Sequence, residues 1–382
     1  MKIVHLTPHL PPDQAANALL PFQLGEWARA QGDMVTFVAH PPVHGAATGP
    51  AAGVITIPRT TRNALQRTLR LGSIAGAWRI RRHATAAIRA ADVVHVHSNG
   101  LLPEVGAAIA AHLGTPYVLT LYGTEIWHYR PKRIGPDLFT RAYRGASAVT
   151  FYSRRLMERG RELGLDRPDL HVVYPAVAES FRHHDADAQR RERAALGITA
   201  RHLLVNVKRL HPLAGQRFLL EAMPAVLREH PDTHLVICGA GALLDDLQSV
   251  ARSAGVERHV TFAGLVDNPQ VARFCAAADL FVLPSLLEAL PTVAVEALAS
   301  GTPVVSSDNP GGVELNGVFG EDVQVVPRED AVALAGAIAA RLKQPARTAP
   351  ATQATIEHQF RATAVARQYW NLYSAVTRRR QA

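Results

Sequence analysis

Short apolar runs alternate along the chain with longer stretches in which apolar residues recur every three or four positions. The apolar runs are typical of buried strands, and the longer stretches are typical of amphipathic helices. The runs include residues 1–10, 34–40, 91–98, 202–210 and 278–285, and the helical stretches include 18–32, 100–114 and 216–230. Because the two patterns alternate, the sequence predicts α/β domains built on parallel, doubly wound sheets.

Residues 284–305 place two carboxylates around one strand-to-helix corner. Glu288 lies on a tight loop after a predicted buried strand. The spacing becomes helical after Pro291, and this helix carries Glu296 near its start and ends at Gly301. Ligands of open α/β sheets bind at the carboxyl ends of strands, where helix N–H groups suit a phosphate and carboxylates accept hydrogen bonds from sugar hydroxyls. Either acid alone would more often be a solvated surface group.

This stretch resembles the signature of retaining GT-B glycosyltransferases of the family-four type, which reads Pro-Ser, two residues, Glu, seven residues, Glu-Ala, then Gly-x-Pro-Val. The matching residues are Pro284, Ser285, Glu288, Glu296, Ala297, Gly301, Pro303 and Val304. The resemblance implies an α/β protein with two Rossmann-like doubly wound domains facing a cleft. We expect an acceptor-binding domain at 1–180, a donor-binding domain at 190–355 and a C-terminal helix at 356–382 that crosses back to the first domain.

Length and composition agree with this organisation. A chain of 382 residues is too long for one ordinary core, and its 48% hydrophobic and 19% charged content is typical of a globular protein. We expect no spanning helix, because no stretch of eighteen uncharged apolar residues occurs. The N-terminus lacks a signal-peptide pattern, and Cys238 and Cys275 fit a reducing compartment. A cytoplasmic protein is therefore expected, and a peripheral place on the inner membrane face is left open.

Positive charge is concentrated in the first half of the chain. The net charge is +9, and residues 1–180 contain 20 Lys and Arg against 12 Asp and Glu. Residues 59–89 contain no acid, and their arginines interleave with Leu, Ile and Trp. Such a segment predicts either a helix on an anionic membrane surface or an ordinary surface helix packed on the sheet. Nucleic acid ranks below both, because no nucleic-acid-binding motif accompanies the charge.

The chain departs from the family in the loop after the strand at 202–210. The family pattern is Gly-Arg-Leu, three residues, then Lys-Gly, and its Arg and Lys hold the donor diphosphate and stabilise its charge. Arg209 and Gly215 match, but Ala214 replaces the lysine. Either Lys208 or Arg217 supplies the second positive charge, or catalysis is weak or lost; we favour compensation.

The resemblance assigns roles to further residues. It implies that Arg209 and Glu288 are the catalytic residues, that Glu288 binds hydroxyls of the donor sugar, and that Glu296 binds the ribose. The predicted donor-binding set is Lys208, Arg209, Gly239, Gly241, Val266, Glu288, Leu290, Pro291, Thr292, Val293 and Glu296. Candidates on the acceptor or sugar side are His97, Tyr122, Gly123 and Glu125. The family has His-Gly where this chain has Tyr122-Gly123, so His97 is a candidate stand-in.

The expected activity is transfer of a hexose-type sugar from a UDP- or GDP-sugar to an acceptor hydroxyl, with retention at the anomeric carbon. The acceptor is expected to be a saccharide, a lipid-linked sugar or a small molecule, in surface polysaccharide or glycolipid assembly. We expect no cofactor and no metal, because no Asp-x-Asp pair follows a strand. Two alternatives are a nucleotide-sugar 2-epimerase of the same fold and a nucleotide-sugar-binding protein without turnover. An epimerised donor in the absence of acceptor would identify the first, and donor binding without transfer the second.

Overall fold

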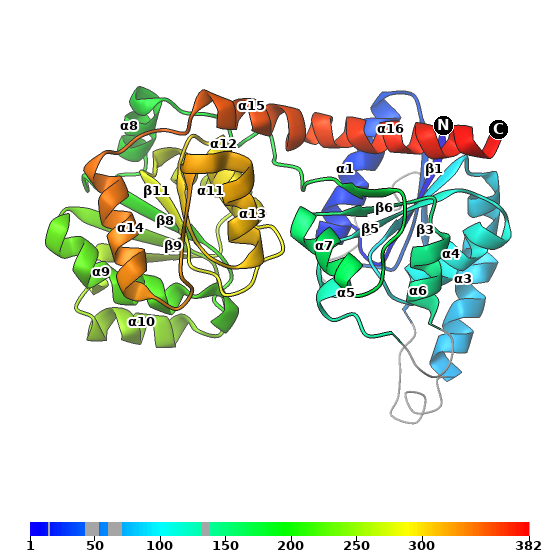
Figure 1. Cartoon of the computed structure of the whole chain (residues 1–382), viewed down its shortest axis with the longest axis horizontal. Helices are drawn as coiled ribbons and strands as arrows, with labels where there is room; N and C mark the ends of the chain where they lie inside the picture. Colours follow the sequence, from blue (N-terminus) through cyan, green and yellow to red (C-terminus); the bar gives the residue numbers. More distant parts are fainter. Residues whose placement is uncertain (14–15, 43–52, 60–70, 132–136, 382) are drawn as a thin grey trace. The chain divides into compact units, whose positions relative to one another are not determined.

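A computed structural model describes the chain except residues 14–15, 43–52, 60–70, 132–136 and 382 (Figure 1). The described residues form two compact units. The first comprises Met1–Pro175 and Thr363–Ala382, and the second comprises Ala176–Ala362. Each unit is an α/β structure built on one parallel sheet.

The first unit contains a seven-stranded parallel sheet in the order β3-β2-β1-β4-β5-β6-β7. The strands are β1 Lys2–Thr7, β2 Met34–Ala39, β3 Val54–Thr56, β4 Val93–His97, β5 Tyr117–Leu121, β6 Ala148–Phe151 and β7 Leu170–Val172. The helices are α1 Ala16–Ala30, α3 Leu71–Ala90, α4 Leu101–His112, α5 Thr124–Trp127, α6 Leu138–Gly145, α7 Arg154–Glu162 and α16 Ala362–Gln381. The C-terminal helix α16 therefore belongs to the first unit, apart from its first residue.

The two faces of this sheet differ in chemistry because successive side chains of a strand point to opposite faces. One face is apolar: Val4, Leu6 and Val96 pack with buried side chains of α3 and α4. The opposite face carries polar side chains that are nevertheless buried, among them His95 and Thr120. Tyr369 and Tyr373 of α16 hydrogen-bond to this polar face, and α1 contacts β1 and β2.

The second unit contains a six-stranded parallel sheet in the order β10-β9-β8-β11-β12-β13. The strands are β8 His202–Val207, β9 Thr233–Cys238, β10 Val260–Gly264, β11 Leu280–Leu283, β12 Val304–Ser307 and β13 Val323–Val326. The helices are α8 Ala186–Ala195, α9 Gln216–Glu229, α10 Leu244–Ser253, α11 Asn268–Ala277, α12 Thr292–Ala299, α13 Pro310–Phe319, α14 Ala331–Lys343 and α15 Pro350–Gln359. Buried residues of α9, α10 and α14 form one apolar core with the sheet, while α11 packs with α8 and α12.

The predicted α/β class with two doubly wound parallel sheets is confirmed, as is the return of the C-terminal helix to the first unit. Strand order reverses between β1 and β4 in the first sheet and between β8 and β11 in the second. Ligands of such sheets bind beside the carboxyl ends of the strands at this reversal. None of the described helices is long and apolar enough to cross a bilayer.

Candidate functional site

The loop after β8 presents a cation at the strand-order reversal of the second sheet. Arg209 is exposed and has no acidic partner among the described residues. The buried Gln216 holds this loop, because its side-chain amide donates to the carbonyl oxygens of Lys208 and Arg209, each at 3.3 Å. The guanidinium is therefore anchored through its backbone while its donors stay available to an anion.

Three glycines allow the backbones of three loops to pack closely against one another at this edge of the sheet. Gly239 has φ 148°, and a Cβ there would lie 2.0 Å from the carbonyl oxygen of Lys208. A Cβ at Gly241 would lie 2.1 Å from the Leu210 carbonyl oxygen, and one at Gly215 would lie 2.0 Å from that of Pro284. The two glycines of the turn after β9, expected beside a nucleotide, thus have an evident structural role: they let this turn pack on the loop of Arg209.

An ion pair joins the loops after β8 and β11. The Nζ of Lys208 lies 2.5 Å from Oε1 of Glu288, a contact with the geometry of an ion pair rather than of a directed hydrogen bond. Arg217, the other cation considered for the role of the missing lysine, is exposed and pairs with Glu221 one helical turn away, at 2.7 Å. Ala214 is buried in the short turn before α9. Of the two candidates, Lys208 is therefore the one beside Glu288.

Residues at the start of α13 hold the loop of Glu288 in place through hydrogen bonds. The Glu288 carbonyl oxygen accepts the N–H of Gly311 at 3.0 Å. The side-chain amide of Asn309 donates to the Ser285 carbonyl oxygen at 2.8 Å, and its oxygen caps α13 by accepting the N–H of Gly312 at 3.0 Å. Sequence reasoning missed Asn309, although an Asn-Pro pair before a helix is a recognisable cap signal.

Helix α12 carries the second acid of the signature. It begins at Thr292 with Pro291 at the N-cap, so the first N–H groups of the helix have no partner within it. Glu296 lies in the second turn and is half-buried, and burial raises its pKa to about 7. The preceding Leu290 is buried, and Val266 lies in the loop after β10. Hydrogen bonds donated by hydroxyl groups would stabilise the charged form of a carboxyl group with this pKa.

Replacing Glu296 by glutamine is expected to stabilise the fold at pH 8. Because the pKa of Glu296 is raised in the folded protein, its carboxyl group supports the fold fully at acidic pH, and this contribution is lost as pH rises through about 7. Glutamine carries no charge at any pH and avoids this loss. The free energy of unfolding at pH 8 should therefore rise by on the order of 2 kcal/mol. Thermal unfolding of both proteins at pH 5 and pH 8 measures this; an equal gain at both pH values would contradict it.

In the first unit, the predicted residues lie at the carboxyl ends of two neighbouring strands, His97 at the end of β4 and the others just after β5. Tyr122 follows this strand, and Gly123, with φ 147°, is the N-cap of α5. The buried carboxylate of Glu125 accepts the N–H groups of Tyr122 and Gly123, at 3.2 and 2.9 Å, and the hydroxyl of Ser98 at 2.5 Å. Glu125 therefore holds the turn that presents Tyr122.

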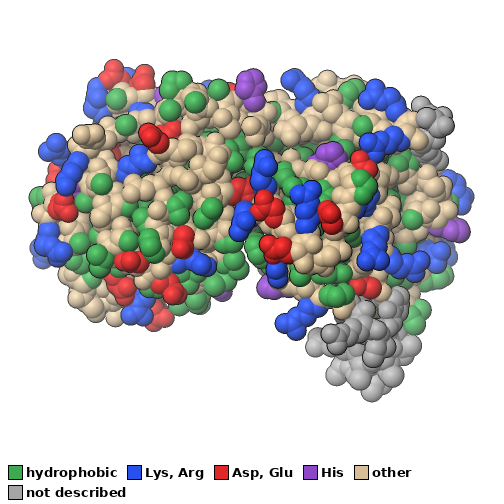
Figure 2. Space-filling view, in the orientation of Figure 1, with side chains coloured by type: hydrophobic (Ala, Val, Ile, Leu, Met, Phe, Trp, Pro, Cys, Tyr) green, Lys and Arg blue, Asp and Glu red, His purple; other side chains and the backbone are tan. Residues whose placement is uncertain are grey.

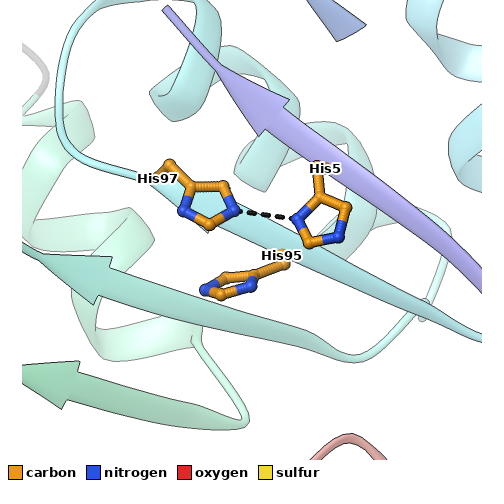
Figure 3. Close-up of side chains that lie close together, drawn as sticks. All are labelled: His5, His95 and His97. Atoms are coloured by element: carbon orange, nitrogen blue, oxygen red, sulfur yellow. Dashed lines mark hydrogen bonds between the residues drawn. The ribbon is translucent and has the colours of Figure 1, made fainter. Parts of the chain in front are cut away.

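Three buried histidines, His5, His95 and His97, lie close together on β1 and β4 (Figure 3). His97 Nδ1 lies 2.7 Å from the Tyr122 hydroxyl, and its Nε2 lies 2.9 Å from His5 Nδ1. His95 contacts the hydroxyls of Tyr373 and Thr120, each at 2.6 Å. One ligand atom from each histidine lies within 4.8 Å of the others, a spacing that could hold a metal ion. However, both nitrogens of His95 and of His97 already have hydrogen-bond partners, and only Nε2 of His5 has none among the described residues.

Sequence reasoning singled out His97 but missed His5, which lies in the middle of an apolar run. The sequence pattern that could have revealed His5 is the alternation of side chains between the two faces of β1 and β4. It places His5, His95 and His97 on one face of the sheet, and the pairing of His5 with His95 sets them side by side.

Comparison with known families accounts for both units. The family described as Glycosyltransferase Family 4 matches residues 22–181, and the family described as Glycosyl transferases group 1 matches residues 188–358. The chain belongs to the group 1 glycosyl transferases. The GT-B type of the fold, expected from the signature around Glu288 and Glu296, is thereby confirmed.

Two curated relatives of this family show how far the similarity extends. A GDP-mannose-dependent alpha-(1-6)-phosphatidylinositol monomannoside mannosyltransferase of Mycolicibacterium smegmatis is 32% identical over 246 residues, 61% of this chain and 62% of that protein. A putative teichuronic acid biosynthesis glycosyltransferase, TuaC, of Bacillus subtilis is 34% identical over 254 residues, 65% of this chain and 60% of that protein. The matches thus span about 60% of each relative's length.

The fold resembles solved structures over nearly the whole chain. The crystal structure of Anabaena Alr3699/HepE in complex with UDP has a TM-score of 0.75 and covers 98% of this chain and 100% of that one, at 19% identity. At this identity the likeness concerns the fold.

Proposed function

We propose that the chain transfers a hexose-type sugar from a nucleotide-diphosphate sugar to an acceptor hydroxyl, with retention at the anomeric carbon. The observation that carries the proposal is the gathering of charged groups at the strand-order reversal of the second sheet. There Arg209 and the Lys208–Glu288 ion pair follow β8 and β11, and α12 presents Glu296.

Each group has a role suited to its chemistry. Arg209 binds the diphosphate, because a guanidinium presents several donors to phosphate oxygens. Lys208 supplies the second charge that stabilises the leaving phosphate. Glu288 accepts hydrogen bonds from hydroxyls of the donor sugar and Glu296 from the ribose, while the N–H groups at the start of α12 bind phosphate. The leaving phosphate takes the proton of the acceptor hydroxyl in a front-face displacement.

For the nucleotide base and for the acceptor we propose classes rather than single compounds. The mycobacterial relative is named for GDP-mannose and the solved neighbour contains UDP, so both bases stay in the proposal. The names of the relatives, for a phosphatidylinositol mannoside and for teichuronic acid, support a lipid-linked or saccharide acceptor in surface glycan assembly. A small-molecule acceptor is the remaining option.

A two-step experiment tests the function. Thermal unfolding with UDP, GDP and their hexose conjugates identifies the donor, because at equal concentration a ligand that binds more tightly raises the melting temperature further. The selected donor is then incubated with saccharide and lipid-linked acceptors, and the anomeric configuration of the product is determined by NMR. An α-linked product from an α-donor supports the proposal. An inverted product, or an epimerised donor without acceptor, contradicts it.

We expect transfer to survive EDTA. The diphosphate charge is balanced in our proposal by Arg209, by Lys208 and by the start of α12, which together can replace a divalent ion. The measurement is the initial rate with 5–10 mM EDTA, as is usual for about millimolar divalent ions, against an untreated control. Loss of the rate, and its return when magnesium or manganese is added in excess, would contradict the metal-free mechanism.

Binding without turnover is the second candidate, and Ala214 is the observation that favours it. With the lysine of the family absent, the charge beside the diphosphate depends on Lys208, which is engaged by Glu288. Calorimetric donor binding with no product across the acceptor panel would support this candidate. Donor hydrolysis or transfer would exclude it.

We further propose that the chain is cytoplasmic and that α3 touches an anionic membrane surface. Ile74 and Trp78 are exposed one turn apart, and the guanidinium of Arg82 lies 5.6 Å from the centre of the Trp78 ring. Further basic residues are exposed on the same helix at Arg81 and Arg89. Figure 2 shows Lys and Arg side chains spread over the visible surface of this unit. Residues 60–70 of the predicted segment lie outside the described residues.

Flotation with anionic vesicles tests this surface. The triple variant Arg81→Glu, Arg82→Glu, Arg89→Glu should float at least about tenfold less than wild type, because each basic residue near the surface contributes about 1 kcal/mol. The control carries the same charge change in the second unit, as Arg190→Glu, Arg191→Glu and Arg252→Glu, at three exposed positions. Equal flotation of the two triple variants would contradict the assignment to α3.

A further inference from the structure

A row of polar groups crosses the first sheet near the carboxyl ends of its strands. Its members are His5 of β1, His97 of β4, Tyr122 after β5 and Tyr152 after β6. His5 Nδ1 lies 2.9 Å from His97 Nε2, the contact dashed in Figure 3, and His97 Nδ1 lies 2.7 Å from the Tyr122 hydroxyl. The rings of Tyr122 and Tyr152 pack beside each other, with their centroids 4.6 Å apart. The hydrogen bonds of the row are therefore continuous from His5 to Tyr122.

We propose that this row is a directed hydrogen-bond chain that starts at His5 and makes the Tyr122 hydroxyl a donor toward a bound sugar. In this assignment His97 is a positioning residue that acts through Tyr122. The identity of the ligand as a sugar rests on the proposed function. The direction of the chain rests on the geometry alone.

The direction follows from the one nitrogen that has no partner. His5 Nε2 is buried and has no hydrogen-bond partner among the described residues. A neutral imidazole carries its proton on either Nδ1 or Nε2. An orphaned N–H is rarer in protein interiors than an acceptor with a spare lone pair. The proton of His5 therefore belongs on Nδ1, where it can be donated to His97.

The remaining protons are then fixed one after another. His97 Nε2 accepts from His5, so the proton of His97 must be on Nδ1, from which it is donated to the Tyr122 oxygen. The hydroxyl hydrogen of Tyr122 is thereby turned away from His97. In our proposal a ligand hydroxyl at this edge of the sheet accepts this hydrogen, beside the ring of Tyr152, whose centroid lies 4.6 Å from that of Tyr122.

Burial keeps every member of the chain uncharged, as the proton count requires. Desolvation, followed by the charge of Arg29, lowers the pKa of His5 to about 3. Desolvation and the neighbouring His95 and His5 lower the pKa of His97 well below its usual value. Desolvation raises the pKa of Tyr122, so its hydroxyl keeps its proton. Each histidine therefore has one N–H and one acceptor nitrogen at physiological pH.

Nitrogen NMR of the full chain labelled at histidine tests the direction without reference to activity. Two-bond ¹H–¹⁵N correlations distinguish the Nδ1–H from the Nε2–H tautomer, and His5→Asn and His97→Asn assign the signals. We expect Nδ1–H for both His5 and His97, whereas the exposed His112 should show the signals of a solvated ring. Nε2–H at both positions would reverse the chain and overturn the proposal. One equivalent of zinc bound at His97 Nε2 would overturn it as well.

Kinetics test whether His97 acts through Tyr122. With UDP-glucose or GDP-mannose as donor and water as acceptor, Tyr122→Phe and His97→Leu should each lower kcat about tenfold with KM unchanged. The double variant should be no slower than Tyr122→Phe alone, because the two residues form one unit. His97→Asn, which keeps an N–H near the position of Nδ1, should recover most of the loss, and exposed His112→Leu should have no effect.

The outcomes separate this inference from the function on which it rests. If wild type turns over a donor but the two losses add in the double variant, the positioning role of His97 is wrong and the transferase assignment stands. If wild type neither binds nor turns over any donor, the proposed function fails, and the tautomers still decide the direction of the chain. Melting temperatures of all variants within a few degrees of wild type exclude unfolding as the cause of a loss.

Discussion

Replacing Lys208 by methionine is expected to lower donor turnover at least about 100-fold, the usual effect of removing one group that stabilises transition-state charge. Methionine keeps most of the length of the side chain but removes its charge. The family lysine is absent at Ala214, and Arg217 is engaged with Glu221 on the surface of α9, so the substitution removes the second cation of the proposed diphosphate site. The initial rate of donor consumption, in the presence and absence of acceptor, measures the effect.

Two further variants make this prediction specific. Ala214→Lys in the Lys208→Met background should restore part of the rate, because it returns the charge to the position at which the family has it. Arg217→Met should leave the rate within about twofold of wild type, since surface ion pairs contribute little. A normal rate in Lys208→Met together with a collapse in Arg217→Met would show that the other cation performs the role.

The second large effect is expected at Glu288. Glu288→Gln should lower transfer about 100-fold or more, because the carboxylate that we propose accepts hydrogen bonds from sugar hydroxyls is replaced by a neutral group. The same variant should bind UDP or GDP at least as tightly as wild type, since Lys208 is released from its ion pair and can meet the phosphates. Weaker binding of the nucleotide sugar, without weaker binding of the free nucleotide, would assign Glu288 to the sugar rather than to the phosphates.

Calorimetry with the free nucleoside diphosphate and with its hexose conjugate measures both affinities. A matched control is Glu221→Gln, which removes a carboxylate from an ion pair outside the site. If Glu288→Gln weakens the free nucleotide as much as the conjugate, Glu288 supports the phosphate site rather than the sugar site.

The order of strands and helices and the two acids of the signature could be predicted from sequence, because both depend on local patterns. The apolar runs identified β1, β4, β8 and β11, and Glu288 and Glu296 were placed by a strand, a loop and a helix that are contiguous in the chain. Parallel sheets then bring the carboxyl ends of neighbouring strands to one edge. The loop of Arg209 could be expected there for the same reason.

What could not be predicted depends on pairs that are far apart in sequence. Lys208 and Glu288 meet because β8 and β11 are neighbours in the sheet, and the sequence left Lys208 and Arg217 as equal alternatives. The engagement of Glu125 by backbone N–H groups needed the conformation of a turn around a glycine at φ 147°. Likewise, an aromatic-rich C-terminal helix does not reveal that Tyr373 meets His95.

The contact between Tyr373 and His95 has a consequence for the folding of the chain during its synthesis. The first unit is discontinuous in the chain: α16 is synthesised only after the whole of the second unit. Until then, a nascent chain has its amino-terminal sheet without Tyr369 and Tyr373, the hydroxyl partners of Thr120 and His95. Co-translational folding usually proceeds from the amino terminus, but here the amino-terminal unit must wait until α16 has been synthesised before its own interior is complete.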